Sequence, residues 1–139
     1  MPATGCVNSP ISFTNTSTND IRATTTFTWA FGDTNTSTVQ NPTHTYTAVQ
    51  AFNPQLTLSY TGVTGCSNNT TKNINIVAAQ TPTITASLPE ICPTEVSTLT
   101  VAGTFTTYQW NTNATTASID VSTPGDYTVN TTDANGCVG

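Results

Sequence analysis

The stretch FTWAFGDTNTSTVQNPTHTY, residues 27–46, is the most informative part of the sequence for the fold. It begins with Phe27, Trp29 and Phe31 at every second position, which is the period of a strand with one buried face. The turn sequence GDTNTST follows, and the stretch ends in NPTHTY, which contains the single histidine, His44. This order of strand, turn and strand indicates a β-sandwich.

The rest of the chain repeats this pattern of short, alternating strands. The segments are ISFTNTS, QLTLSY and NINIV in the first half, and STLTVAG, TYQWN, ASIDV and GDYTVNT in the second. Turn residues separate them, and we find no helical periodicity over ten or more residues. We therefore predict an all-β fold of two tandem Ig-like β-sandwich modules, residues 1–78 and 83–139, joined by a linker at residues 79–82.

The composition excludes several classes of partner. Charged residues make up 6% of the 139-residue chain, against about 25% in a typical protein, and only Arg22 and Lys72 are basic. Nucleic acid is therefore an improbable partner, because its phosphates require clustered Lys and Arg. No stretch approaches the ~20 apolar residues that span a bilayer, so we expect no membrane insertion. We also expect no cofactor, and we expect the chain to be a segment of a longer protein.

Four cysteines, Cys6, Cys66, Cys92 and Cys137, allow three pairings. No two have the spacing of zinc ligands, so a zinc site is improbable. Each half of the chain holds two, near its start and its end. We predict that Cys6 pairs with Cys66 and Cys92 with Cys137, each bond being worth ~4 kcal/mol in the chain-entropy model. Such bonds persist in oxidising surroundings, which favours an exported, extracellular protein; four buried free thiols are the alternative.

Residues 6–77 resemble a PKD (polycystic-kidney-disease-type) domain, which carries an aromatic-x-Phe-Gly-Asp-Gly turn followed by Asn-Pro-x-His-x-Tyr. In this chain WAFGDT and NPTHTY match those two motifs. The matching residues are Trp29, Phe31, Gly32, Asp33, Asn41, Pro42, His44 and Tyr46. Thr34 stands where the family usually has its second Gly, and TAVQAFNPQLTL replaces a shorter connection.

Residues 83–139 resemble the Ig-like repeats that accompany PKD domains in very large bacterial surface proteins. The matching segments are ICPTEVSTLTV, YQWNTNATTASIDVSTPGDYTV and TDANGC. Such proteins are often exported by the type IX secretion system and serve in adhesion, gliding or surface filaments. The resemblance implies neighbouring modules of the same kind as partners, a homo-oligomer or filament, and a surface glycan or protein ligand.

The candidate chemical residues have a structural interpretation. A general base needs a substrate proton within reach and a group that orients it, and no suitably placed nucleophile accompanies His44. We expect Asp33 to accept backbone N–H groups in the turn that Gly32 makes, and His44 to pack near Trp29. A pair of glycosidase carboxylates, such as Asp120 with Asp126, is a remote alternative. Asp126 and Asp133 could hold Ca²⁺, but residues 133–136 are also typical of a hairpin turn.

Two functions from different classes remain. The first is a non-catalytic structural and adhesive segment of an extracellular cell-surface protein or filament, in which stiff modules in series project a distal part from the cell. The alternative is a carbohydrate- or protein-binding accessory module of a secreted hydrolase, which an exposed row of planar aromatic side chains would favour. An ice-binding threonine array is a weaker third idea, because the threonines follow no fixed repeat.

Overall fold

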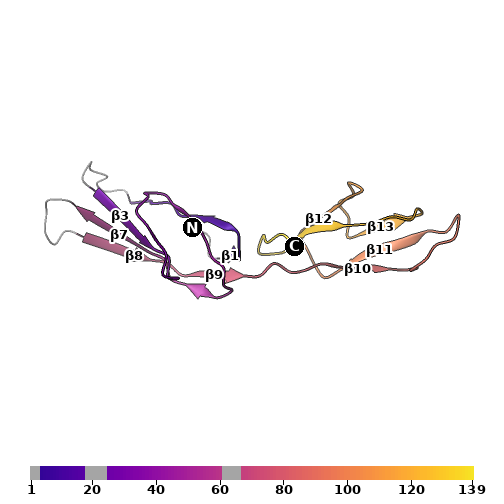
Figure 1. Cartoon of the computed structure of the whole chain (residues 1–139), viewed down its shortest axis with the longest axis horizontal. Helices are drawn as coiled ribbons and strands as arrows, with labels where there is room; N and C mark the ends of the chain where they lie inside the picture. The colour runs from indigo at the N-terminus through magenta and orange to yellow at the C-terminus, as the bar shows by residue number, and fades with distance from the viewer. Residues whose placement is uncertain (1–3, 18–24, 61–66) are drawn as a thin grey trace. The chain divides into compact units, whose positions relative to one another are not determined.

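The computed structural model describes residues 4–17, 25–60 and 67–139, and the regular elements within them are strands (Figure 1). The chain divides into two compact units, Met1–Ala78 and Ala79–Gly139. The first unit contains β1 (Thr4–Cys6), β2 (Pro10–Ser12), β3 (Thr25–Ala30), β4 (Thr36–Ser37), β5 (Thr43–Thr45), β6 (Ala51–Phe52), β7 (Gln55–Tyr60), β8 (Ser67–Thr71) and β9 (Ile74–Val77). The second unit contains β10 (Thr83–Ala86), β11 (Ser97–Ala102), β12 (Thr107–Trp110), β13 (Ser118–Val121) and β14 (Val129–Thr132). The predicted all-β fold of Ig-like sandwich modules is confirmed.

The first unit is built around a sheet in the order β4-β3-β7-β8, whose strands β3, β7 and β8 lie side by side in Figure 1. All of its pairings are antiparallel. Two smaller sheets, β1-β9-β6 and β2-β5, complete the unit. β1 and β9 run parallel, with Thr4 opposite Asn75 and Cys6 opposite Val77.

The inward positions of these strands form one aromatic and aliphatic core. Trp29 and Leu56 lie opposite each other on β3 and β7, and both are buried because alternate residues of a strand face the same side. The buried members of this core are Ile11, Phe13, Trp29, Phe31, Tyr46, Phe52, Leu56, Ile74 and Ile76. The outward positions of β3, Thr26 and Thr28, are exposed, as the period of two predicts.

The second unit consists of the antiparallel sheet β10-β11-β13 and the antiparallel pair β12-β14. Its core is smaller and centres on Trp110, which is 1% exposed and donates its indole N–H to the Thr116 carbonyl at 2.9 Å. Leu99, Val101 and Phe105 complete the buried cluster. Residues 79–82, expected to act as a linker, belong to this unit, since the Gln80 N–H donates to Asp133 Oδ2 at 3.4 Å.

The cysteine pairing in the second unit differs from the prediction. Cys92 is a free, exposed thiol, so the predicted Cys92–Cys137 bond is wrong, although Cys137 is in a disulfide-bonded state. The physical reason is the direction of β10. Cys137 shares Asp133 as a hydrogen-bond acceptor with Gln80, just before β10, whereas Cys92 lies in the connection that leaves the other end of this strand. The predicted Cys6–Cys66 bond involves a residue outside the described part of the chain.

Among the described residues, no helix has the length and apolar character needed to cross a membrane.

Candidate functional site

The turn after β3 is shaped by two residues with positive φ. Gly32 has φ +88°, and a Cβ there would lie 3.3 Å from the backbone nitrogen of Asn53. Thr34 has φ +76°, a conformation that glycine adopts freely but that crowds a β-branched side chain. The Phe31 N–H donates to the Asn35 carbonyl at 3.0 Å and closes the turn. Thr34 therefore has a backbone conformation that favours glycine, the residue usual at this position of the motif.

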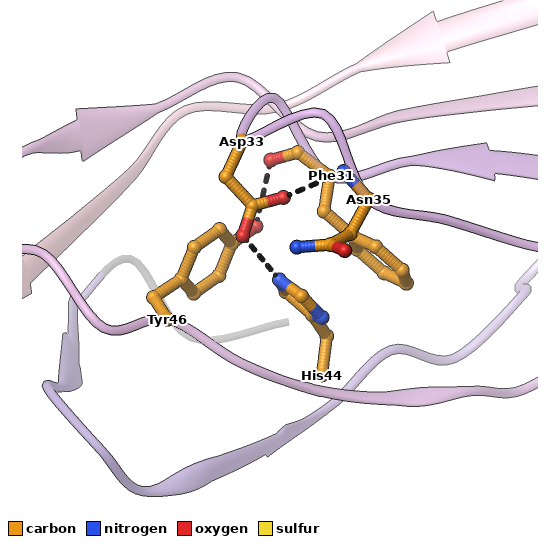
Figure 2. A network of polar contacts seen from close by, with 5 residues as sticks. All are labelled: Phe31, Asp33, Asn35, His44 and Tyr46. Atoms are coloured by element: carbon orange, nitrogen blue, oxygen red, sulfur yellow. Dashed lines mark hydrogen bonds and ion pairs between the residues drawn. The ribbon is translucent and has the colours of Figure 1, made fainter.

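Asp33 connects this turn to β5. Its Oδ1 accepts the backbone N–H of Asn35 at 3.2 Å, and its Oδ2 lies 2.7 Å from Nε2 of His44 (Figure 2). The side chains of His44 and Asp33 are 12% and 18% exposed, so water screens the pair only in part. Both carboxylate oxygens of Asp33 are thus used within the fold.

The imidazole of His44 is held by aromatic rings. It stacks on Phe31, with ring centroids 4.0 Å apart and an angle of 6° between planes, and it meets the edge of Tyr46 at 4.6 Å. The Tyr46 hydroxyl donates to the Phe31 carbonyl at 2.9 Å, and Figure 2 shows this bond on the same turn. We expected His44 to pack near Trp29, but its stacking partner is Phe31, while the ring of Trp29 meets that of Phe13.

This arrangement shifts two pKa values. Burial raises the pKa of the Asp33 carboxyl, but hydrogen bonds from His44 and Asn35, together with the charge of His44, outweigh burial and hold the pKa below its usual value. Burial, assisted by the negative charge of Asp33, raises the pKa of Tyr46 to about 12. The folded state therefore favours an ionised Asp33 and a neutral Tyr46.

The second half of the motif fastens the strands around this group. Asn41 Oδ1 accepts the backbone N–H of Asn15 at 2.8 Å, and the Pro42 carbonyl accepts the N–H of Phe13 at 2.8 Å. The indole N–H of Trp29 donates to the Gln40 carbonyl at 3.3 Å. These bonds attach the segment before β5 to the residues that follow β2 and to β3. Part of the motif therefore supports the turn after β3, and part of it holds the neighbouring segments together.

The chemical capacity of the Asp33–His44 pair is limited by what surrounds it. A nucleophile activated by a histidine must lie within hydrogen-bond reach of the ring. Within the described residues, the hydrogen bond of the His44 side chain is to Asp33, and no Ser, Thr or Cys side chain is bonded to the ring. The flat stack on Phe31 also covers one face of the imidazole. This geometry orients strands rather than a substrate.

Asp133 organises the hairpin after β14 in the second unit. Its Oδ1 accepts the backbone N–H groups of Asn135 at 2.8 Å and Cys137 at 3.0 Å, while Gly136 takes φ +83°. The pKa of Asp133 lies below its usual value, and the largest cause is the hydrogen bond from the Cys137 N–H. Together with the bonds from Asn135, Gln80 and Gly136, it outweighs the opposing effect of burial. Residues 133–136 thus have the geometry of a hairpin turn, and their carboxylate is satisfied by N–H groups.

The other two acidic candidates have hydrogen-bond partners elsewhere in the second unit. The Asp126 carbonyl accepts the Asn111 side-chain amide at 2.8 Å, and Asp120 Oδ1 accepts the Thr98 hydroxyl at 2.7 Å. In the part of the chain that the structure describes, no three His, Cys, Asp or Glu side chains are grouped as metal ligands would be.

Sequence reasoning considered Asp33 and His44 separately and missed their contact. The available signal was their shared motif: a turn that reverses the chain places the residue after Gly32 beside the strand that carries His44 and Tyr46. Sequence reasoning also missed the anchoring role of Asn15, for which the sequence offers no signal, because its partner Asn41 is 26 residues away.

Comparison with known proteins agrees with the geometry of the first unit. The family described as the PKD domain matches residues 1–78. Among solved structures, the ICAM-5 D1–D4 ectodomain fragment is similar, with 20% sequence identity and a TM-score of 0.48. That similarity covers 99% of this chain, which spans 42% of the ICAM-5 fragment. No curated protein matches the sequence.

Proposed function

Because the chain belongs to the PKD domain family through residues 1–78, we propose that it is a non-catalytic structural and adhesive segment of a large extracellular cell-surface protein. PKD and Ig-like domains generally serve as structural or adhesive modules in extracellular proteins, and such modules commonly mediate protein–protein contacts. The finer proposal is a role as a stalk or part of a surface filament, in which neighbouring modules of the same long chain are its first partners.

The observation that carries this proposal is that the polar side chains of the motif are used to hold strands together. Asp33, His44 and Tyr46 are the polar residues that a catalytic site would need. Their hydrogen bonds go to Asn35, to each other and to the Phe31 carbonyl. Polar groups with satisfied partners in the interior stabilise one arrangement of strands, and they have little capacity left for a substrate.

The parallel pair β1–β9 allows the first unit to resist a pulling force, as a module of a stalk must. The chain enters this unit through β1 and leaves it after β9, and the two strands are paired over Thr4–Cys6 and Asn75–Val77. The Val7 N–H extends the ladder with a bond to the Val77 carbonyl at 2.9 Å. A pull on the N-terminal side of β1 and the C-terminal side of β9 acts along two parallel strands in opposite directions. It therefore loads these bonds together, in shear.

The localisation that follows from this proposal is extracellular, at the cell surface. The disulfide-bonded state of Cys6 and Cys137 supports an oxidising compartment. Export by a type IX secretion system, a surface glycan or protein ligand and assembly into a homo-oligomer or filament are parts of the proposal that rest on the resemblance of the sequence alone.

The accessory-module alternative receives less support. Sugar-binding surfaces present aromatic rings to solvent, but the large exposed apolar side chains among the described residues are aliphatic: Val39, Val49, Ile84, Leu88, Val96 and Val138. The aromatic residues of the motif are instead in the core.

Pulling single molecules by the two ends of the chain, with the disulfides reduced, tests the structural role. We expect the first unit to resist force because its terminal strands are loaded in shear. Val7→Pro removes the N–H that bonds Val77 and should lower the unfolding force of this unit. His44→Ala is the matched control, because it weakens the unit away from β1 and β9. Compared with Val7→Pro, it should have a large effect on the melting temperature and a small effect on the unfolding force.

The opposite pattern would contradict the proposed mechanism. If Val7→Pro leaves the unfolding force unchanged while His44→Ala lowers it strongly, the parallel pair does not bear the load. Hydrolysis of a glycan or peptide by the purified chain, abolished by His44→Ala in a protein that remains folded, would contradict the non-catalytic assignment.

A further inference from the structure

The stretch of chain between β9 and β10 is held at two points by hydrogen bonds. We call residues 78–82, which lie between these strands, the junction segment. Before it, β9 ends at Val77, whose carbonyl accepts an N–H of the first unit at 2.9 Å. Within it, the Gln80 N–H donates to Asp133 Oδ2 at 3.4 Å. Two residues, Ala78 and Ala79, separate the held positions Val77 and Gln80.

The two carboxylate oxygens of Asp133 have different tasks. Asp133 is 6% exposed, and its Oδ1 accepts two N–H groups of its own hairpin, those of Asn135 and Cys137. Its Oδ2 accepts the N–H of Gln80. The side chain of Gln80 is also near the second unit, because a Cβ on Gly103 would lie 3.2 Å from Gln80 Nε2. One oxygen therefore shapes the hairpin, and the other fixes the junction segment.

The surroundings of Asp133 make this contact depend on its ionisation. Besides Gln80 and the hairpin, the segment before β12 contacts Asp133, where the Thr106 hydroxyl donates to the Asp133 carbonyl at 3.3 Å. Among these neighbours Cys137 is disulfide-bonded, and none of the others titrates. N–H groups bind a carboxylate more strongly than a neutral carboxyl group. Oδ2 has one N–H partner where Oδ1 has two, so a proton added to Asp133 goes to Oδ2 and displaces Gln80.

We propose that the Asp133 carboxylate is a pH-sensitive clasp on the junction segment. In its ionised state the clasp fixes Gln80 and leaves Ala78 and Ala79 as the free residues between the units. Protonation releases Gln80, and the free stretch then extends through Pro82 to the start of β10. A longer free linker reaches further and permits more orientations of the units that it joins. The clasp thus adjusts the stiffness of the proposed stalk; its use rests on that proposed function, but its chemistry does not.

Asp133→Asn separates the two tasks of this side chain. Asparagine has one acceptor oxygen, and the orientation that keeps the two bonds of Oδ1 turns the Nδ2 donor toward the Gln80 N–H. We expect the Gln80 amide to exchange its hydrogen at least about fivefold faster in this variant, because a lost hydrogen bond to a charged group has an effect of this size. The amides of Asn135 and Cys137 should remain protected. In NMR relaxation, residues 78–81 should become more mobile, and the two units should tumble more independently.

Asp120→Asn is the matched control for the lost charge. Asp120 is an exposed residue of the same unit that accepts the Thr98 hydroxyl, so its substitution should leave exchange at Gln80 unchanged.

The wild-type chain provides a second test that needs no substitution. The pKa of Asp133 is lowered in the folded state, so the clasp is closed at neutral pH and opens as the pH falls through the lowered value. Below about pH 4, the amide signals of Gln80, Asn135 and Cys137 should shift with one common midpoint. The protection of Gln80, measured against an unstructured peptide at the same pH, should then fall to its value in Asp133→Asn.

Three results would overturn the proposal: equal protection of Gln80 in wild type and Asp133→Asn, an equal loss of protection in Asp120→Asn, or a Gln80 signal that does not follow the midpoint of Cys137. If Asp133→Asn opens the whole hairpin and exposes Cys137, the wild-type titration decides. The clasp fails or holds on these amide signals, whereas the structural role fails on unfolding force or hydrolysis, so the two failures are distinguishable.

Discussion

Replacing His44 by alanine should destabilise the first unit by about 2–4 kcal/mol at pH 7. The substitution removes the 2.7 Å bond to Asp33, and bonds of this kind to charged groups contribute about 1.5–3 kcal/mol. We take the lower half of that range, because Asp33 is 18% exposed and water can partly replace the histidine. The lost stack on Phe31 adds about 0.5–1.5 kcal/mol. For a unit of this size the melting temperature should fall by about 10–30 °C.

The measurement needs a signal that belongs to the first unit. Trp29 is buried there, and replacing Trp110 by phenylalanine in all samples leaves Trp29 as the single tryptophan. Urea unfolding followed by its fluorescence then yields the free energy of unfolding of this unit. Thr45→Ala, next to His44 but exposed, is the control and should change the free energy by less than about 0.5 kcal/mol. A loss below 0.5 kcal/mol for His44→Ala would refute the structural role of the pair.

The same pair has a pH dependence with a defined sign. The pKa of Asp33 is lower in the folded state than in the unfolded chain. Its contribution to stability is therefore present above the unfolded pKa of about 4, and it is lost as the pH falls through the lower folded pKa. The stability difference between wild type and Asp33→Asn should shrink as the pH falls below about 4. A difference that does not change with acidification would contradict the assignment.

Three further predictions concern other parts of the molecule. Thr34→Gly should raise the free energy of unfolding of the first unit by about 0.5–1 kcal/mol, because relief of the positive φ outweighs the greater flexibility of glycine; a destabilised variant in the same urea titration would contradict this. Asp133→Asn should lower the melting temperature of the second unit, measured through Trp110. The stability that Asp133 supplies is present above its unfolded pKa and is lost as the pH falls through its lowered folded pKa, so the difference from wild type should shrink in acid. Alkylation of the native, oxidised chain should label Cys92 and not Cys137, and Cys92→Ser should leave both melting transitions unchanged; an unreactive Cys92 would show that it is bonded.

Strand positions in this protein follow closely from the sequence. The alternation of Phe27, Trp29 and Phe31 predicts a half-buried strand, and β3 covers the first two of these residues. The alternation of Ile74 and Ile76 likewise corresponds to β9, in which both are fully buried. These predictions succeed because the period of two is a local property of an extended chain, and burial of one face selects the side chains that repeat with it.

The cysteine pairing shows where this reasoning ends. Cys92 and Cys137 are near the two ends of the second unit in sequence, and we predicted their pairing for that reason. A strand, however, carries the chain away from its starting point at about 3.3 Å per residue, so β10 separates Cys92 from the Asp133 hairpin that holds Cys137. Nearness in space depends on the route of the chain, which spacing along the sequence does not reveal.

The sequence by itself determined the all-β character, the turn at Gly32 and the family of the first unit, because alternation, turn residues and motif order are all written in consecutive positions. Only the tertiary structure decided that Asp33 contacts His44, that Phe31 rather than Trp29 stacks on the imidazole, and that Thr34 keeps a positive φ. These features arise between strands, where the sheet register brings residues together that the sequence holds far apart.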